Sequence, residues 1–390
     1  MNIGFKSSAW SEAVSPVQKT ISERIKIART LCIFFMTFVH IPPGISDNSG
    51  SDELGVFDIV YFIFTRMVGL SSVSLLSMVS GYFIVSSLLR AGTQQLIVSK
   101  VRTLIVPLVA WNVLLLVIYA FYSRLSDDWQ NWPEANLLAI ANAFLAVTDW
   151  PLDIPLWFLR DLFVCCLFSP VLYWGLRRLP AAVMLALVAF ALFGEGLYIL
   201  QRPQLILFFG LGMWLRMADA DEDSIDRATR LLAAGLIGTA AIFLTILVAR
   251  IHFSEMNEQL RQTLETLLRL TMAAAFWWLT GLIRKSPLAG PFMRFEPYTF
   301  FLFCSHAIFF FFAAIPFRWA FGNYGSDLFP ITFFTLPFLA VIAAIIGLRI
   351  ANRSRLLLFL FNAGHALPAS SSAAHEPSAS SPANRDLRRG

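Results

Sequence analysis

The sequence predicts an all-α protein, a polytopic membrane helix bundle with about ten transmembrane helices. Of the 390 residues, 57% are apolar and only 14% are charged, whereas a soluble domain carries nearer a quarter of charged residues. Apolar stretches of roughly bilayer-crossing length recur along the whole chain. The four cysteines all lie inside these stretches, and their spacing indicates neither a disulfide framework nor a metal site.

Hydrophobic length sets the ten expected spans, because a helix needs about 20 residues to cross the hydrocarbon core. The spans cover residues 27–41, 67–89, 103–122, 155–176, 181–200, 203–217, 231–249, 263–283, 298–317 and 330–348. Residues 56–66 are apolar but interrupted, which favours an interfacial helix leading into the second span.

The distribution of basic residues orients the bundle. With the N-terminus inside, 22 of the 30 Lys and Arg residues fall on inner segments and five on outer ones. This is a strong positive-inside pattern, so we expect both termini in the cytoplasm. Residues 1–22 form the expected cytoplasmic N-terminal segment. Residues 356–390, which end in a stretch rich in Ala, Ser and Pro, are expected to form a cytoplasmic, largely disordered tail.

Two loops carry acidic residues. The large outer loop, residues 123–154, places carboxylates beside tryptophans, a combination that suits sugar hydroxyls and pyranose faces. The alternative is an aromatic belt with solvated acids. The acidic run at residues 219–223, on the inner side, is expected to be a solvated loop.

Arg29 and His40 are the most informative pair of residues in the chain. They lie eleven positions apart, so a helix returns them to within roughly 20° of one face, about 16 Å apart along its axis. A cation at the membrane edge in line with a titratable ring deep in the membrane indicates a pathway with chemistry along it. The alternative is an arginine that extends to the headgroups and a histidine that contacts interfacial water.

Other ionisable residues inside spans are further candidates, because burying such groups in a membrane is costly. Asp161 could orient an imidazole, or together with Arg160 it could hold helices together. Glu195 lies between two glycines and is a second candidate acid, although the glycines could equally mark close helix packing. Glu265 and Arg269, four residues apart, are expected to satisfy each other. His306 is either a base or a neutral, hydrogen-bonded ring.

Several common catalytic motifs are absent from the sequence. It contains no glycine-rich phosphate loop, no His/Cys metal cluster and no Gly-x-Ser-x-Gly elbow. Proton-transfer groups and cations without a covalent nucleophile favour direct attack by a deprotonated hydroxyl on an activated donor.

The order of several short motifs resembles the integral-membrane acyltransferase 3 family over most of residues 22–350. These motifs are Arg29-x10-His40, Val79-Ser80-Gly81-Tyr82-Phe83, Lys100-Val101-Arg102 with Pro107, Leu156-Trp157-Phe158-Leu159, Phe209-Gly210-Leu211-Gly212 and His306. The length and the opening at residues 23–29 resemble stand-alone members that succinylate or acetylate secreted polysaccharides such as succinoglycan.

The resemblance implies a membrane acyltransferase domain at residues 23–355 in a bacterial cytoplasmic (inner) membrane. It would transfer a succinyl or acetyl group from acyl-CoA, a co-substrate rather than a bound cofactor, to a hydroxyl of an exported polysaccharide or its lipid-linked precursor. The implied partners are these substrates, the lipid bilayer and other glycan-assembly proteins, and no nucleic acid is expected.

The site expected from the residues and the resemblance has three parts. His40 is the catalytic base, with Asp161 or Glu195 to orient it. The donor-binding cations are Arg29, Lys100 and Arg102, the last two in a linker that departs from the family's usual Arg-x-x-Arg. Trp157, Arg160 and His306 are expected to bind substrate.

Rival hypotheses remain open at this point. A polysaccharide or small-molecule exporter would also place ionisable groups within the membrane, but the halves of the sequence show no internal symmetry. The other large class of membrane acyltransferases, which acylates proteins or lipids, is built around a single histidine flanked by apolar residues. In this chain that histidine would be His306. A scaffold for glycan assembly would lack transfer activity altogether.

Overall fold

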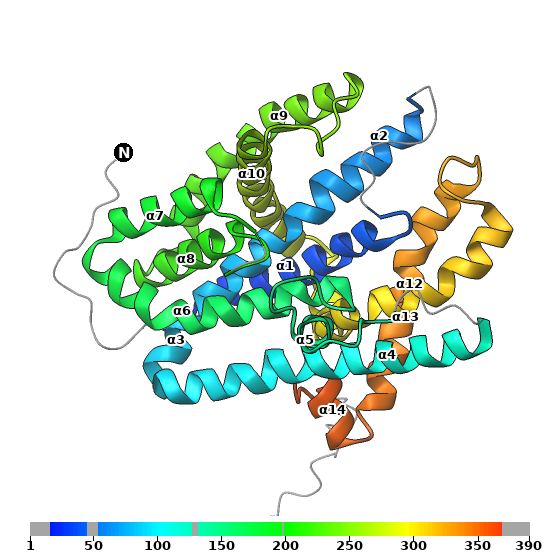
Figure 1. The fold of residues 1–390 in the computed structure, drawn as a ribbon. Coiled ribbons are helices and arrows are strands. Elements are labelled where there is room, and N and C mark those ends of the chain that lie inside the picture. The colour runs from blue at the N-terminus through cyan, green and yellow to red at the C-terminus, as the bar shows by residue number, and fades with distance from the viewer. Residues whose placement is uncertain (1–15, 45–53, 127–131, 197–198, 369–390) are drawn as a thin grey trace, which may run out of the picture.

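The computed structural model describes residues 16–44, 54–126, 132–196 and 199–368. Within these ranges all regular secondary structure is helical, which confirms the predicted all-α class (Figure 1). The α-helices are α1 (Lys19–Thr37), α2 (Val56–Phe62), α3 (Leu70–Lys100), α4 (Val106–Ser126), α5 (Leu137–Leu145), α6 (Trp157–Arg178), α7 (Pro180–Phe193), α8 (Gln204–Met217), α9 (Glu222–Val248), α10 (Glu258–Arg284), α11 (Ala289–Phe295), α12 (Thr299–Phe321), α13 (Phe329–Ala351) and α14 (Arg355–Phe361).

Each of the ten predicted spans overlaps one of these helices, but not all are equally able to cross a membrane. In the described residues, six helical runs are long and apolar enough to do so by length and composition. They are Val56–Arg124, Ile154–Arg178, Glu222–Val248, Glu258–Arg284, Ala289–Phe321 and Phe329–Ala351. Helices α7 and α8 are apolar but shorter. The chain is a multi-pass membrane protein, and the full count of ten crossings stays a prediction.

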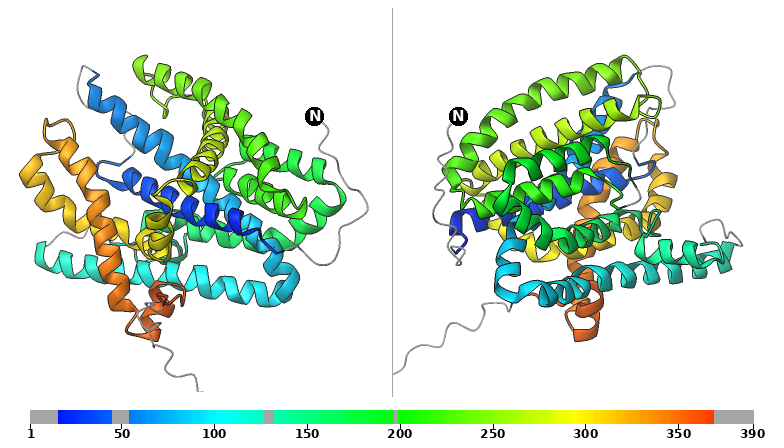
Figure 2. Two further views of the ribbon diagram at one scale, coloured as in Figure 1. Left: turned by 180° about the vertical axis from the view of Figure 1, so that it is seen from behind. Right: turned by 60° about the vertical axis from the view of Figure 1, so that its left-hand side comes forward.

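The first of these runs joins the expected interfacial helix and two expected spans. Helix α2 passes through a π-helical turn, Ile63–Gly69, directly into α3, so the apolar segment before the second span is continuous with it. Gly92 adopts a φ of 73°, a conformation that residues with a side chain rarely adopt, and it breaks the helical path of α3. The chain then turns, and α4 runs along the edge of the bundle opposite to α9, at the bottom of Figure 1 (Figures 1 and 2).

The backbones of helices α3 and α8 pack closely against each other, and glycines allow this close approach. A Cβ atom on Gly81 would collide with the backbone oxygen of Phe209, and one on Gly212 would collide with that of Met78. Small residues let helix backbones approach closely, which is a main source of association inside a membrane. Two of the sequence motifs noted above therefore describe one helix crossing.

Helix α1 runs through the interior, in contact with α3, α10, α11 and α12. At its start the fully buried Arg24 donates to Glu222 at 3.0 Å and to Asp226 at 2.7 Å, and its guanidinium lies 4.1 Å from the centre of the Trp277 ring. The acidic run at residues 219–223 is thus not simply the solvated loop that was expected, since Glu222 fixes α1 to α9.

The predicted tail begins as packed structure. Helix α14 lies against α4, where Trp111 Nε1 donates to the backbone oxygen of Phe361 at 3.2 Å. Residues 369–390 lie outside the described residues. Structure therefore continues past residue 355, the boundary expected for the membrane domain.

Candidate functional site

His40 stands at the end of a short helical turn that aromatic packing holds in place. Helix α1 ends at Thr37 and continues as a 3₁₀ turn, Phe38–His40. The Phe38 ring centre lies 4.9 Å from that of Phe64 and 5.2 Å from that of Phe333. This clamp fixes the turn, and it presents the half-buried His40 to a cavity rather than to the packed core.

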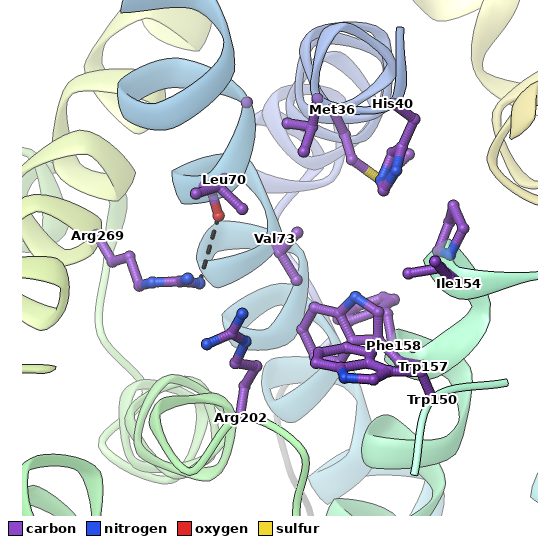
Figure 3. Close-up of a pocket in the computed structure, with 13 residues that line it drawn as sticks. Met36, His40, Leu70, Val73, Trp150, Ile154, Trp157, Phe158, Arg202 and Arg269 are labelled. Atoms are coloured by element: carbon purple, nitrogen blue, oxygen red, sulfur yellow. Dashed lines mark hydrogen bonds between the residues drawn. The ribbon is translucent and has the colours of Figure 1, made fainter. Parts of the chain in front are cut away.

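The cavity beside His40 has a volume of about 230 Å³. Its walls combine aromatic rings and cations, as Figure 3 shows. Trp150, Trp157 and Phe158 supply one side, while Arg202 and Arg269 approach from another. None of the described residues that line it is acidic. An imidazole, flat apolar walls and cationic donors together suit an uncharged ring with hydroxyls as well as an anionic substituent.

His306, on α12, lies next to His40 but is not among the residues that line the cavity. The centres of the two imidazole rings are 5.1 Å apart, and His306 is fully buried. Its Nδ1 atom is 2.8 Å from the carbonyl oxygen of Phe303 and 3.2 Å from that of Leu302, so Nδ1 carries the proton and donates. Nε2 is then an acceptor, and it has no hydrogen-bond partner among the described residues. The structure brings together the two histidines that the sequence singled out separately.

Asp161 holds a loop instead of meeting His40. Its carboxylate accepts from the backbone N–H groups of Gln201 at 3.1 Å and Arg202 at 3.0 Å, and from Arg160 Nη1 at 2.9 Å. It does not line the cavity that His40 lines. These contacts favour the helix- and loop-holding interpretation of Arg160 and Asp161 over an acid that orients the imidazole, and the catalytic role of Asp161 stays a prediction.

Arg160 extends the same anchoring network. It donates to the carbonyl oxygens of Ile199 at 2.6 Å and Val147 at 3.0 Å. Gln201 Nε2 donates to the carbonyl oxygen of Asp149 at 2.8 Å. This network joins the loop before α6 to the loop before α8, and these loops carry Trp150 and Arg202 to the cavity.

Glu195 lies apart from this site. Helix α7 ends at Phe193, earlier than the predicted end of the fifth span at residue 200, and Glu195 is exposed in the following loop. The expected carboxylate inside a span is therefore a loop residue, because Gly194 ends the helix. A catalytic role for Glu195 has no contact with His40 to support it among the described residues.

Arg29 and Lys100 line a second cavity, of about 540 Å³. Arg29 forms an ion pair with Glu296 at 3.0 Å and lies 5.6 Å from the centre of the Phe83 ring. Residues after α14, including His365 and Pro368, complete its wall. Arg102, the third predicted donor-binding cation, is exposed and is not among the residues that line this cavity.

Phe158 lines both cavities. It is buried near the start of α6, and its ring centre lies 5.8 Å from that of Phe303, which also lines the cavity of Arg29. Arg29 and His40 therefore line different cavities that share the Phe158 side chain in their walls, although both residues belong to one continuous helical segment.

The sequence alone did not place Arg202 or Arg269 at this cavity. Arg202 was counted only as an outer-loop cation, and Phe158 was noted only as part of the Leu156-Trp157-Phe158-Leu159 motif. Arg269 was expected to be satisfied by Glu265, and their ion pair is present, although at 3.8 Å. Trp150 did carry a signal, because it belongs to the tryptophan-rich outer loop. In the same loop Trp132 is exposed, and Asp127, Asp128 and Trp129 lie outside the described residues.

The fold and this histidine-lined cavity describe a multi-pass membrane protein with groups suited to acyl transfer. The family profile of an acyltransferase domain, Acyl_transf_3, matches residues 23–350, and the chain belongs to this acyltransferase family. The expectation of an acyltransferase is thereby confirmed.

One curated relative covers most of the chain. The sequence is 26% identical over 337 residues to the succinoglycan biosynthesis protein ExoH of Rhizobium meliloti (strain 1021), across 82% of this chain and 86% of that protein. No solved structure matches the chain.

Proposed function

We propose that this acyltransferase moves an acyl group from acyl-CoA to a hydroxyl of a polysaccharide or of its lipid-linked precursor. The observation that carries the proposal is the pair of cavities that meet at Phe158. One offers an imidazole and aromatic walls to an acceptor, and the other offers Arg29 and Lys100 to an anionic donor. The similarity to a protein of succinoglycan biosynthesis supports a glycan acceptor.

In the proposed step, His40 removes the proton from an acceptor hydroxyl while the oxygen attacks the thioester carbonyl carbon. The carbon–oxygen ester bond forms, the carbon–sulfur bond breaks, and the departing thiolate takes up a proton. The products are the acylated glycan and free coenzyme A. A well-placed general base of this kind contributes about 10²- to 10⁴-fold to the rate.

His306 supports this step by staying neutral. Its Nδ1 proton is committed to backbone oxygens of α12, so Nε2 presents a lone pair on the side away from them. When His40 takes up a proton, a neutral His306 beside it adds no second positive charge, whereas two adjacent imidazolium ions would repel each other. We assign His306 a positioning role behind the base.

Arg29 and Lys100 would hold the phosphates of coenzyme A at the cytoplasmic side, since guanidinium and ammonium groups pair strongly with phosphate. The basic-residue distribution supports an orientation with both termini on that side and residues 123–154 outside. The membrane in this proposal is a bacterial inner membrane. Donor and acceptor would then approach from opposite faces, and the acyl group would pass Phe158.

Transfer of a radiolabelled acyl group in membranes tests the activity. Membranes that contain the protein should move label from acyl-CoA to a glycan fraction, and the ester should be released by mild base. Membranes without the gene provide the control. Unchanged ester content of secreted glycan on deletion, together with altered amounts of exported glycan, would favour an exporter instead.

Reporter fusions test the two-sided arrangement separately. Compartment-sensitive reporters placed near Asp128 and after Gly364 should report opposite sides of the membrane. A cytoplasmic signal from the fusion near Asp128 would overturn the topology and the two-sided mechanism with it, while leaving the transfer activity itself open to the first assay.

A further inference from the structure

Two guanidinium groups face the cavity of His40 without an acidic residue in its lining. Arg269 comes from α10 and Arg202 from the loop before α8, and both point into the same space, across from His40 (Figure 3). Arg269 is only 5% exposed, so its charge is held largely out of water. Bringing two cations to one buried space is unfavourable unless an anion joins them.

The partners that these arginines do have leave them only partly satisfied. Arg269 donates to the carbonyl oxygen of Leu70 at 3.3 Å, and its ion pair with Glu265, at 3.8 Å, is longer than a hydrogen bond. Arg202 has its guanidinium 5.5 Å from the centre of the Trp150 ring, and it has no ion-pair partner within the described parts of the chain. Each guanidinium thus retains donors that can turn to a ligand.

Arg24 shows what a saturated buried arginine looks like in this protein. Its guanidinium donates to two carboxylates, to Thr280 at 3.1 Å and to the carbonyl oxygen of Trp277 at 2.7 Å. Four of its five N–H donors thus have acceptors among the described residues. The contrast indicates that Arg202 and Arg269 are not simply structural ions of the same kind.

We propose that Arg202 and Arg269 form an anion-binding subsite that takes a carboxylate or phosphate group of a substrate while the reacting hydroxyl lies at His40. Planar guanidinium groups bind such anions through paired, charge-assisted hydrogen bonds. The identity of the substrates in this inference rests on the proposed function. The subsite itself rests on the cavity and its charges.

Two sources supply this anion chemistry. One is the free carboxylate of a dicarboxylic acyl chain on the donor, and the other is a phosphate or acidic sugar on the acceptor. The two differ in which substrate the arginines select. They are separated below by exchanging the donor and the acceptor independently.

A binding test needs no acyl transfer. The purified full-length protein in detergent is heated with increasing concentrations of succinate, or of inorganic phosphate, and with succinamide as the uncharged analogue. The anions should raise Tm, succinamide should not, and Arg202→Gln and Arg269→Gln should lose the shift. Arg261→Gln is the control, because Arg261 lies on the same helix as Arg269, forms an ion pair with Glu258 at 3.8 Å and is not among the residues that line the cavity.

The transfer assay then identifies the source. If the anion is on the acyl group, Arg202→Gln and Arg269→Gln should raise KM for succinyl-CoA by roughly tenfold or more and leave acetyl-CoA nearly unchanged. If it is on the acceptor, KM for the acceptor should rise with either donor. Arg202→Lys and Arg269→Lys, which keep the charge, should recover part of the effect.

Lysine rescue also covers the case in which Arg269→Gln fails to fold because Glu265 is left unpaired, and Arg202→Gln provides an independent test. The subsite would be overturned if Arg202→Gln and Arg269→Gln gave the same Tm shifts and the same KM values for donor and acceptor as the control Arg261→Gln. Wild-type protein that binds succinate or phosphate but transfers no acyl group would overturn the proposed function while leaving the subsite standing.

Discussion

The two cavities on either side of Phe158 differ in what encloses them. The cavity of His40 is small, and two loops joined by hydrogen bonds contribute Trp150 and Arg202 to its walls. The cavity of Arg29 has more than twice the volume, and part of its wall comes from residues after α14. A small rigid site suits a reacting hydroxyl, whereas a larger site near the chain end suits a bulky donor. The division of labour in the proposed mechanism follows from this difference.

Removing the imidazole should have the largest effect. We expect His40→Ala and His40→Gln to lower the transfer rate by about 10²- to 10⁴-fold, because the general base is lost. Radiolabelled acyl transfer in membranes measures this, with expression and Tm as controls for folding. If both variants retain activity within a few-fold of wild type while His306→Gln is inactive, the roles of the two histidines are reversed.

Neutralising the cations of the other cavity should act on the donor. We expect Arg29→Gln and Lys100→Gln to raise KM for acyl-CoA by roughly 10- to 100-fold, the value of a charge-assisted hydrogen bond, with little change for the acceptor. Lys100→Gln is the cleaner variant, since Arg29 also pairs with Glu296.

The exposed Arg102 provides the matched control for the donor cavity. Its side chain is not among those that line the cavity, so Arg102→Gln should leave KM for acyl-CoA within about twofold, as surface charges contribute little. An equal rise in KM for Lys100→Gln and Arg102→Gln would show that the cavity boundary does not define the donor site.

Replacing Phe158, which lines both cavities, with a smaller side chain should give the smallest effect, a change of a few-fold at most in the rate of acyl transfer. Phe158→Leu leaves a gap between the cavities, so water gains access to the thioester and the ratio of hydrolysed acyl-CoA to transferred acyl group should rise. Phe163→Leu, on the same helix but outside both linings, is the control. An unchanged ratio in Phe158→Leu would mean that Phe158 does not separate water from the thioester.

The sequence predicted the helices well because each apolar stretch is a local signal. It also predicted the joint importance of Arg29 and His40, because helical phase relates residues eleven apart. The structure refines this relation: the last turn is a 3₁₀ turn with fewer residues per turn, and the two side chains open to different cavities.

The rest of the site arises from contacts that no local pattern encodes. Trp150 and Arg202 reach His40 because Arg160 and Asp161 tie together two loops that are about 50 residues apart in the sequence. The sequence predicted that Asp161 and His40 lie at a similar depth in the membrane. In the structure, however, the Asp161 carboxylate accepts from backbone N–H groups. Depth in a membrane can be read from a span, whereas lateral position cannot.

The α3–α8 crossing has a consequence for genetics. A methyl group at Gly81 or Gly212 has no space to occupy, so Gly81→Ala and Gly212→Ala should reduce the amount of folded protein rather than its chemistry. A random-mutation screen scored on glycan esters would therefore recover both glycines alongside His40. Protein abundance would tell the two kinds of mutant apart. Because the added methyl group meets backbone atoms of Phe209 and Met78, changing the side chain of either residue should not restore the glycine mutants.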